Sequence, residues 1–427
     1  MPLAAMNPTP RTVRRSLPWL LAALSMIGPF SIDAVFPAFP EIGSRFAVDD
    51  AALQQLISVY LVTYAVMSLF HGAVSDALGR KPVMIAGLLL YALASVGAAL
   101  STSFTMLLAC RGLQGACAGA GLVVGRALIR DSLEGAAAQR LMSQVMMIFG
   151  VAPVIAPMIG ALLLPLGGWH GIFWLLSGFS IALALALGWL LEETHPPSRR
   201  TAFALRPLLA GYVSFGRDAL FWPLLAASSV NFAGLFLYIA SAPRIVRELL
   251  HLSAQGFPWL FVPVVAGMVT GACCSGRLAE RASVSATVNL GYVSMGLACA
   301  LHLALAIALP QPRLPWSMLP LILHGIGVQL AFPTLTLLLL DRFPQRRGGI
   351  SSVQAFASLL LCSVVAGLFS PLLSTSMLGL ALGASALTGA GALAWWRYGT
   401  LARRTPERDL PPADPGAPIQ AEIAEPR

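Results

Sequence analysis

Long apolar stretches recur along this chain of 427 residues, and they restrict how it can fold. About 20 consecutive apolar residues are enough to cross the hydrocarbon core of a bilayer as an α-helix. Twelve stretches of this kind begin near Leu17, Ala52, Val83, Phe104, Leu141, Trp169, Ala219, Phe257, Val284, Leu314, Ser351 and Met377. The sequence therefore predicts an all-α membrane protein with twelve transmembrane helices.

The composition agrees with a chain that lies mostly in lipid. Hydrophobic residues make up 57% of it and charged residues only 11%, whereas soluble domains carry about 25% charged residues. The six cysteines lie inside apolar stretches, without CxxC pairs or histidines at ligand spacing. We interpret them as small packing residues, and we expect no metal site and no cofactor.

The distribution of basic residues predicts the orientation in the membrane, because Lys and Arg prefer cytoplasmic loops. With the N-terminus inside, cytoplasmic segments hold 22 of the 27 Lys and Arg residues, outer loops hold four, and Arg111 lies within the fourth apolar stretch. Both termini are therefore expected on the cytoplasmic side. The net charge of +9 follows from this topology, so the expected surroundings are a lipid bilayer and no nucleic acid.

The longest interior connection divides the expected helices six and six and predicts two similar bundles. The segment "GAVSDALGRK" from Gly72 follows the second stretch, and the related "GRLAER" from Gly276 follows the eighth. Parallel repeats of this kind build the two halves of some transporters. We predict a cytoplasmic tail (1–16), a six-helix bundle (17–191), a cytoplasmic loop (192–217), a second six-helix bundle (218–398) and a disordered cytoplasmic tail (399–427).

One carboxylate, Asp33, lies inside the first apolar stretch, and one guanidinium, Arg111, lies inside the fourth. A charge within a bilayer costs roughly 2.5 to 3.5 kcal/mol on insertion scales, and such residues usually have a partner and a function. At 1.5 Å per residue both lie roughly 9 to 10 Å below the outer surface. We expect them to pair, with Asp33 carrying protons; a purely structural ion pair is the alternative.

The fifth expected helix carries Gly150, Pro153, Pro157 and Gly160, which remove side-chain bulk and backbone donors from it. This pattern predicts a kinked, closely packed surface. The glycines of "GACAGAGLVVG" follow no strand and recur at four-residue spacing. They indicate close helix contact in preference to a nucleotide-binding loop.

A substrate site needs polar and aromatic side chains that face a central cavity. Few charges are available inside the spans, which suits amphiphilic molecules better than phosphorylated ones. Each candidate also has the alternative of a core or lipid-facing position. The candidates are Tyr60, Tyr64, Gln114, Asn231, Tyr238, Gln329 and Gln354, with Met146, Met147, Phe149, Phe232, Phe236 and Phe356 as apolar walls.

Several motifs resemble those of the major facilitator superfamily, in the expected order from about Leu17 to Arg397. "GAVSDALGRKP" is similar to its loop 2-3 signature, "RGLQGACAGAG" to its helix 4 signature, and "GVAPVIAPMIG" to the helix 5 signature of its drug/proton antiporters. "PFSID", "LIRDS" and "IASAP" resemble the bicyclomycin and chloramphenicol resistance (Bcr/CflA) type. After Asp33 the chain departs from that type, with Ala34-Val35-Phe36 where Met-Tyr-Leu is usual.

The resemblance implies a proton-coupled secondary transporter that exports small amphiphilic drugs across the bacterial inner membrane by alternating access. Its partners would be the small-molecule substrate and protons, and we expect a monomer. The helix 5 surface would pack against the other half. A charge cluster would close the cytoplasmic side, with Asp76 near Gly349; its residues are Gly72, Asp76, Gly79, Arg80, Arg130 and Asp131.

Two other functions compete with drug export. A transporter of the same fold for an endogenous metabolite, such as a sugar or an amino-acid derivative, stays open because of the variation at Val35. A membrane-embedded enzyme or receptor is disfavoured, because the sequence lacks a nucleotide loop, a metal cluster and a nucleophile-base pair, and its six histidines are scattered.

Overall fold

The computed structural model describes residues 11–132, 135–278, 281–309 and 311–404. Within these ranges, the side chains at 11–17, 132–151, 122, 126, 130 and 199 are not described. Every described element is a helix, which confirms the all-α membrane fold.

The first part of the chain forms seven α-helices and two short elements: α1 (Arg11–Asp33), η1 (Phe36–Ala38), α2 (Phe39–Phe46), α3 (Asp50–Leu78), α4 (Arg80–Ala99), α5 (Phe104–Gly119), the π-helix η2 (Ala120–Val124), α6 (Gly125–Ser132) and α7 (Gly135–Leu190). The connection that follows contains η3 (Pro197–Arg199) and α8 (Leu205–Phe215).

The second part of the chain is also helical. It forms α9 (Phe221–Val230), α10 (Ala233–Ala240), α11 (Ala242–Arg244), the π-helix η4 (Ile245–Leu249), η5 (Ala254–Gly256), α12 (Pro258–Leu278), α13 (Val284–Ala308), α14 (Pro320–Arg342), η6 (Pro344–Arg346), α15 (Arg347–Val364), the π-helix η7 (Val365–Phe369), α16 (Ser370–Leu373) and α17 (Met377–Ala402).

Ten helical segments of the described chain are long and apolar enough to cross a membrane. One of them lies in α7, whose backbone leaves the helical conformation at Gly167 and Gly168. The run α5–η2–α6 is not among the ten, although it continues from Phe104 to Ser132. If α7 makes two crossings and α5–η2–α6 makes one, the number becomes the twelve that the sequence predicts.

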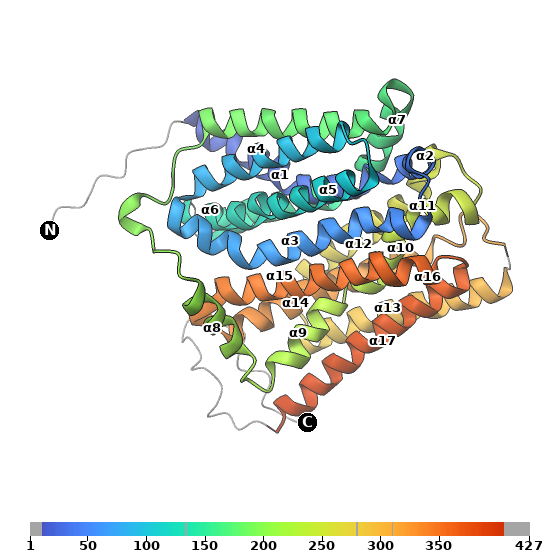
Figure 1. Ribbon diagram of the computed structural model, residues 1–427. Coiled ribbons are helices and arrows are strands. Elements are labelled where there is room, and N and C mark those ends of the chain that lie inside the picture. Colours follow the sequence, from blue (N-terminus) through green and yellow to red (C-terminus); the bar gives the residue numbers. More distant parts are fainter. Residues whose placement is uncertain (1–10, 133–134, 279–280, 310, 405–427) are drawn as a thin grey trace.

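The helices form two groups that meet along α3 and α15 (Figure 1). In the first group α7 packs on α1 and α4, and α5 packs on α3 and α4; in the second, α14 packs on α12 and α13, and α17 packs on α9. We call the end that carries the α3–α4 turn and α8 the proximal end. The end that carries α2, η4 and α16 is the distal end (Figure 1).

The first apolar helix differs from its expected limits. The segment begins at Arg11, before Leu17, and α1 ends at Asp33. Two turn residues, η1 and α2 follow, so the chain changes direction within the apolar stretch. Asp33 is therefore the last residue of a helix, and Pro37 and Pro40 near the starts of η1 and α2 suit these new helix beginnings.

Two glutamates bind the backbone at helix starts in other parts of the chain. Glu193 accepts hydrogen bonds from the N–H groups of Arg80 (3.0 Å) and Lys81 (3.2 Å) at the start of α4. Glu41 accepts one from the N–H of Trp169 (3.0 Å), where α7 resumes after its break. Both carboxylates satisfy amides that a helix N-terminus leaves free, and they complement its dipole.

A glycine precedes each of these helix starts and makes room for the glutamate. Gly79 has φ 102° and Gly168 has φ 58°. A Cβ atom at either position would lie 2.5 Å from a carboxylate oxygen, of Glu193 at Gly79 and of Glu41 at Gly168. Glycine is needed at both positions for its backbone conformation and for its lack of a side chain.

We expect Gly79→Ala and Gly168→Ala each to destabilise the protein by about 1–3 kcal/mol, because alanine strains the backbone and displaces the capping carboxylate. Gly72→Ala is the matched control, since a Cβ atom there meets nothing within 4 Å. Thermal unfolding of the purified variants measures the difference. Equal melting temperatures for all three variants would contradict this account of the two turns.

Candidate functional site

Arg111 lies at the centre of the first helix group with 0% of its surface exposed. Its Nε donates to the carbonyl of Leu56 (3.0 Å), and its Nη1 donates to Ser31 Oγ (3.1 Å) and Gln114 Oε1 (2.8 Å). The guanidinium carbon lies 4.5 Å from the ring centroid of Tyr60. The charge is thus held by neutral acceptors and one aromatic face.

The acceptors of Arg111 are themselves held by α4. Tyr91 donates its hydroxyl proton to Ser31 Oγ (2.6 Å), and Gln114 Nε2 donates to Ser95 Oγ (2.7 Å). Ser95 in turn donates to the carbonyl of Tyr91 (2.8 Å). We call Ser31, Tyr60, Tyr91, Ser95, Arg111 and Gln114 the arginine network. It joins α1, α3, α4 and α5 by hydrogen bonds and ring contact.

The expected ion pair between Asp33 and Arg111 is not formed. Among the described residues Asp33 has no hydrogen-bond or ion-pair partner, although only 3% of its surface is exposed. The reason is angular: residues two apart on a helix do not face the same way. Ser31 faces the guanidinium, so Asp33 points elsewhere, and equal depth does not bring the two charges together.

The end of α1 beside Asp33 packs closely on α7. Gly160 comes so near that a Cβ atom there would overlap the carbonyl oxygen of Ala34. The backbone of α7 keeps helical dihedral angles at Pro153 and Pro157 and leaves them at Gly167 and Gly168. The kink expected at the prolines stays a prediction. Helix α7 also contacts α12 and η5 of the second group. The side-chain environment of Gly150 lies outside the described residues.

Polar side chains of α3 join the two groups toward the distal end. Gln54 Nε2 donates to the carbonyl of Ala240 (2.9 Å), and Gln55 Nε2 donates to that of Gly367 (3.2 Å). Ser58 and Ser363 exchange hydrogen bonds, with their Oγ atoms 2.9 Å apart. Helix α3 can approach this closely because a Cβ atom at position 367 would lie 2.5 Å from Ser58 Oγ.

Charged and aromatic contacts extend this junction to the distal loops. Arg244 Nη2 lies 3.4 Å from Asp50 Oδ2. This ion pair links the end of α11 to the start of α3. Phe36 stacks on Phe261 of α12, with ring centroids 6.4 Å apart. The two groups therefore touch through η1, α3 and α7 on one side and α10, α12 and α15 on the other.

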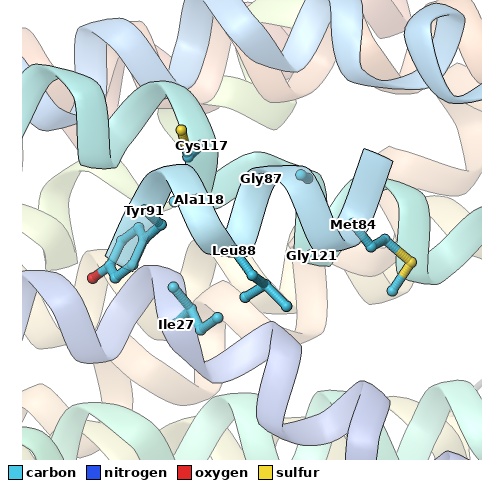
Figure 2. Close-up of a pocket in the computed structure, with 9 residues that line it drawn as sticks. Ile27, Met84, Gly87, Leu88, Tyr91, Cys117, Ala118 and Gly121 are labelled. Carbon is cyan, nitrogen blue, oxygen red and sulfur yellow. The ribbon is translucent and has the colours of Figure 1, made fainter. Parts of the chain in front are cut away.

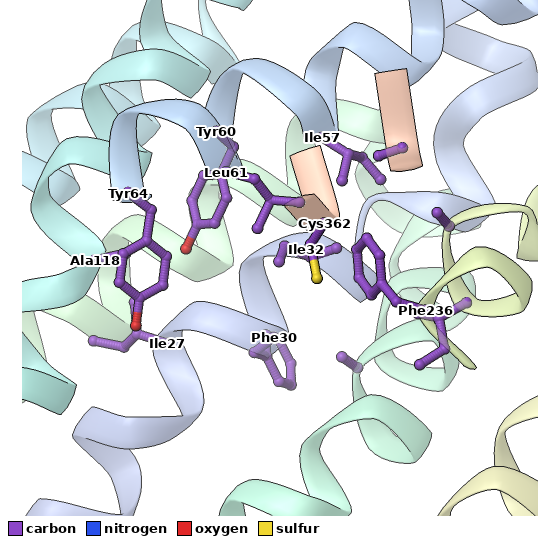
Figure 3. Close-up of a cluster of buried hydrophobic side chains, with 14 of the residues drawn as sticks. Ile27, Phe30, Ile32, Ile57, Tyr60, Leu61, Tyr64, Ala118, Phe236 and Cys362 are labelled. Atoms are coloured by element: carbon purple, nitrogen blue, oxygen red, sulfur yellow. The ribbon is translucent and has the colours of Figure 1, made fainter. Parts of the chain in front are cut away.

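An apolar cluster fills the middle of the junction (Figure 3). Ile32 of α1 and Ile57 of α3 lie near Phe236 of α10 and Cys362 of α15 in this view. Tyr60 of the arginine network borders the same cluster (Figure 3). Phe236, expected as an apolar wall, is thus 5% exposed and packed between the two groups.

The expected charge cluster at the proximal end is largely present. Arg80 Nη1 lies 2.5 Å from Asp76 Oδ1, and its Nε lies 3.0 Å from Asp131 Oδ2. The side chain of Arg130 lies outside the described residues. Gly349, near which we expected Asp76, is instead covered by α8, since a Cβ atom there would meet the rings of Phe215 (3.4 Å) and Tyr212 (3.5 Å).

Helix α8 lies between the two groups at the proximal end. Tyr212 donates its hydroxyl proton to the carbonyl of Leu69 on α3 (2.6 Å), and Phe215 packs on Phe343 with centroids 4.8 Å apart. A cavity of about 660 Å³ lies between α8 and the start of α15, lined by residues that include Arg346 and Arg347. Hydropathy alone did not indicate this helix.

The other substrate candidates are distributed over several environments. Asn231 lies in the turn between α9 and α10, where its Nδ2 contacts Met295 Sδ at 3.9 Å. Tyr238 stacks on His302 inside the second group, so its expected cavity position is wrong. Gln354 Nε2 donates to Thr336 Oγ1 (2.8 Å), which ties it to α14. Gln329 is half-buried beside Gly271.

The remaining candidates include several near the arginine network. Tyr64 contacts Tyr60 edge to face, with centroids 6.2 Å apart, and Phe232 packs on Phe236 at 5.8 Å. The side chains of Met146, Met147 and Phe149 lie outside the described residues.

A small cavity of about 10 Å³ lies between α1, α4, α5 and η2 and is lined by Tyr91 (Figure 2). It has room for one water molecule at most.

Sequence reasoning missed the partners that hold the charged groups. Ser31, Tyr91 and Ser95 surround Arg111 but sit in apolar stretches, where a hydroxyl is easily taken for a packing residue. The hydroxyl of Ser31, two residues before Asp33, was the sequence signal that could have indicated a neutral partner for Arg111. Glu193 caps α4 from a loop 113 residues away, and no local pattern points to it.

The helical membrane fold, with two groups that meet along α3 and α15, is that of a membrane transporter. The chain belongs to the Major Facilitator Superfamily, whose family model matches residues 21–371.

Comparison with known proteins finds relatives that carry transporter names. The uncharacterised MFS-type transporter YdgK of Bacillus subtilis is 30% identical over 85% of this chain and 90% of its own length. Multidrug resistance protein D of Escherichia coli is 27% identical over 76% of this chain and 81% of its own length. The bicyclomycin resistance protein homologue of Haemophilus influenzae is 24% identical over 63% and 68% of the two chains.

Solved structures share the fold. A bacterial homologue of the human lysosomal transporter Spinster, in an inward-facing and unoccupied conformation, has a TM-score of 0.68 and 19% identity, over 95% of this chain and all of the other. The human organic anion transporter MFSD10 has a TM-score of 0.64 and 20% identity, over 92% of this chain.

We expect Arg111→Lys to destabilise the protein by about 1–3 kcal/mol, because one ammonium group cannot reach all three acceptors and leaves buried polar atoms unpaired. Arg247→Lys, at an exposed position, is the matched control. Thermal unfolding of the purified proteins measures both effects. A melting temperature of Arg111→Lys equal to that of the control would contradict the network as a source of stability.

We expect the S58C/S363C variant to form a disulfide on oxidation and to stop transporting until it is reduced, because the two Oγ atoms lie 2.9 Å apart across the junction. Gel mobility after cleavage of the loop between the groups detects the cross-link. The single variants S58C and S363C control for disulfides that involve the neighbouring Cys362. Full transport by completely cross-linked protein would show that this junction does not open during the cycle.

Proposed function

We propose that this protein is a proton-coupled exporter that moves small amphiphilic compounds out of a bacterial cell by alternating access. The observation that carries the proposal is the buried carboxylate of Asp33. It lies inside the first apolar segment, is 3% exposed, and has no hydrogen-bond or ion-pair partner in the described part of the chain. A charged carboxylate is costly in such a place, whereas a protonated one is much less so.

The position of Asp33 at the end of α1 suits a group that changes its surroundings. The two residues after it are turn residues, and the distal junction lies directly beyond them. Opening of that junction would bring Asp33 into contact with water from the distal side, which we assign to the outside. A proton could then enter from the outside and leave on the inside after the halves reorient.

Arg111 supports this cycle as a fixed positive charge. Its Nη2 has no hydrogen-bond partner among the described residues, and its Nη1 holds Ser31, two residues from Asp33. A change in the twist at the end of α1 would exchange Ser31 for Asp33 at the guanidinium. The contact that the sequence predicts would then belong to another conformation of the cycle.

The contacts between the two groups support an inward-facing state. Gln54, Gln55 and Ser58 bind carbonyl and hydroxyl oxygens of the second group near the distal end. At the proximal end, polar links from α3 run to the connection between the groups: Tyr212 of α8 donates to the carbonyl of Leu69, and the N–H of Thr201 donates to that of Asp76. Positive residues prefer the cytoplasm, and Arg80, Arg346 and Arg347 lie at this proximal end.

The substrate class follows from the few charges in the spans and from the relatives. The junction offers aromatic and aliphatic side chains such as Phe236, Ile32 and Tyr60, which suit amphiphilic molecules. Two of the relatives described above are named for multidrug or bicyclomycin resistance. Transport of an endogenous metabolite is the second candidate, and a drug-susceptibility panel in an efflux-deficient host separates the two.

We expect Asp33→Asn to fold normally and to lose drug export driven by an imposed pH gradient, because asparagine cannot carry a proton. Export of a drug identified in the panel is measured in vesicles, with and without the gradient. Asp49→Asn is the matched control, since Asp49 is an exposed N-cap that asparagine can replace. Full gradient-driven export by Asp33→Asn would overturn the assignment.

A further inference from the structure

The second helix group buries two histidines that the proposed cycle does not use. His302 of α13 is 3% exposed and His324 of α14 is 0% exposed. His302 Nε2 lies 3.2 Å from the carbonyl of Ser317. A carbonyl can only accept, so Nε2 carries the proton and Nδ1 presents a lone pair. This Nδ1 and both ring nitrogens of His324 have no partner among the described residues.

One face of α10 covers both histidines. The ring of Tyr238 stacks on His302 with centroids 4.7 Å apart, and its hydroxyl has no hydrogen-bond partner in the described chain. One turn earlier, a Cβ atom at Gly234 would lie 3.2 Å from His324 Cε1. Residues four apart share a helix face, so Gly234 and Tyr238 together form a cover.

Among the described residues, the fixed charges in the elements around these histidines lie away from the pair. Exposed Arg313 is in the adjoining turn, where its backbone N–H donates to Ser317 Oγ (3.0 Å). Helices α9, α10 and α13 contain no Asp, Glu, Lys or Arg. The other helices that pack around the pair carry charged residues only toward their ends: Arg277, Asp341, Arg342, Arg347 and Arg397. The uncharged polar groups on the facing helices include Cys299 and Thr388, whose Sγ and Oγ1 atoms lie 3.6 Å apart. The histidines are thus the groups there that ordinarily titrate near neutrality.

The cover is a short helix between two irregular points. Turn residues precede α10 at Asn231 and Phe232, and another follows it at Ser241. Phe236 lies two residues from Tyr238 and therefore on the opposite side of α10. It packs in the junction between the two helix groups, near Ile32 and Cys362 (Figure 3). Separation of the groups would release the side of α10 that faces away from the histidines.

We propose that His302 and His324 form a second proton-binding site, which α10 covers while the distal junction is closed and uncovers when the two helix groups separate there. The incoming proton binds a free ring-nitrogen lone pair of one histidine, and no covalent bond other than N–H forms. The inference adds to the proposed antiport a second titratable position, in the half of the molecule that lacks Asp33. It rests on that proposed function only for its role in transport.

The first test follows each imidazole directly and requires no substrate. Protein labelled with ¹⁵N in its histidine rings is titrated by NMR between about pH 5 and 8. The signals of the pair are assigned with His302→Gln and His324→Gln. We expect the pair to take up a proton in the reduced S58C/S363C protein and to stay neutral in its cross-linked form. Exposed His251 should titrate in both.

Two results of this titration would overturn the proposal. The first is a pair that stays neutral in the reduced protein as well. The second is a pair that titrates identically in the cross-linked and reduced forms, because α10 would then not control access. Neither result depends on proton-coupled export, so the antiport through Asp33 would still stand. Wild-type protein is the control for the two cysteines: its histidine pair should titrate as the pair does in reduced S58C/S363C.

The second test measures transport. The H302Q/H324Q variant should fold and export the panel drug down its own gradient, yet lose several-fold of the stimulation by a pH gradient. His251→Asn is the control, since asparagine tolerates the positive φ of 52° at that position. If the double variant does not fold, Tyr238→Phe replaces it in this test, because phenylalanine keeps the ring that stacks on His302. This variant should also change how drug export depends on pH. Full stimulation in either folded variant would overturn a role in coupling.

Discussion

The first helix group depends on the way in which one guanidinium is accommodated inside the membrane. Arg111 receives no carboxylate; it receives a carbonyl, a hydroxyl, an amide oxygen and an aromatic face. These partners come from α1, α3 and α5, and α4 holds two of them in place. A charge without a counter-ion keeps an electric field that no neighbouring carboxylate cancels. The same contacts that hold Arg111 in place thus leave its positive charge unneutralised.

The junction between the two groups has a different chemistry. Gln54, Gln55 and Ser58 reach across to backbone carbonyl groups and to one serine, and Gly367 in the π-helix η7 permits the close approach. Water can replace each of these hydrogen bonds at little cost in free energy. An apolar cluster around Phe236 completes the contact. Such an interface is closely packed but held by replaceable contacts, which suits the alternation between two open states that we propose.

The sequence predicts the fold well because lipid leaves few choices: each backbone donor must be satisfied within its own helix, and hydropathy locates the helices. The pairing of Asp76 with Arg80 also follows from local spacing, since the two lie four residues apart on neighbouring turns. The prediction of an Asp33–Arg111 pair is wrong because the depth of a residue in the membrane does not give the direction in which its side chain leaves the helix. Ser31 already faces the guanidinium. The histidine pair lay beyond prediction because His302 and His324 come from different helices and meet only under α10.

The two capping glutamates constrain the order in which the first helix group can be completed during synthesis. The start of α4 needs Glu193, which the ribosome adds 113 residues after Arg80, and Trp169 follows its own partner, Glu41, by 128 residues. Helix α4 therefore enters the membrane with its first amides still bound to water. They receive their protein partner only after the last turn of α7 has emerged. The contact at Gly79 thus marks the end of assembly for this half of the protein.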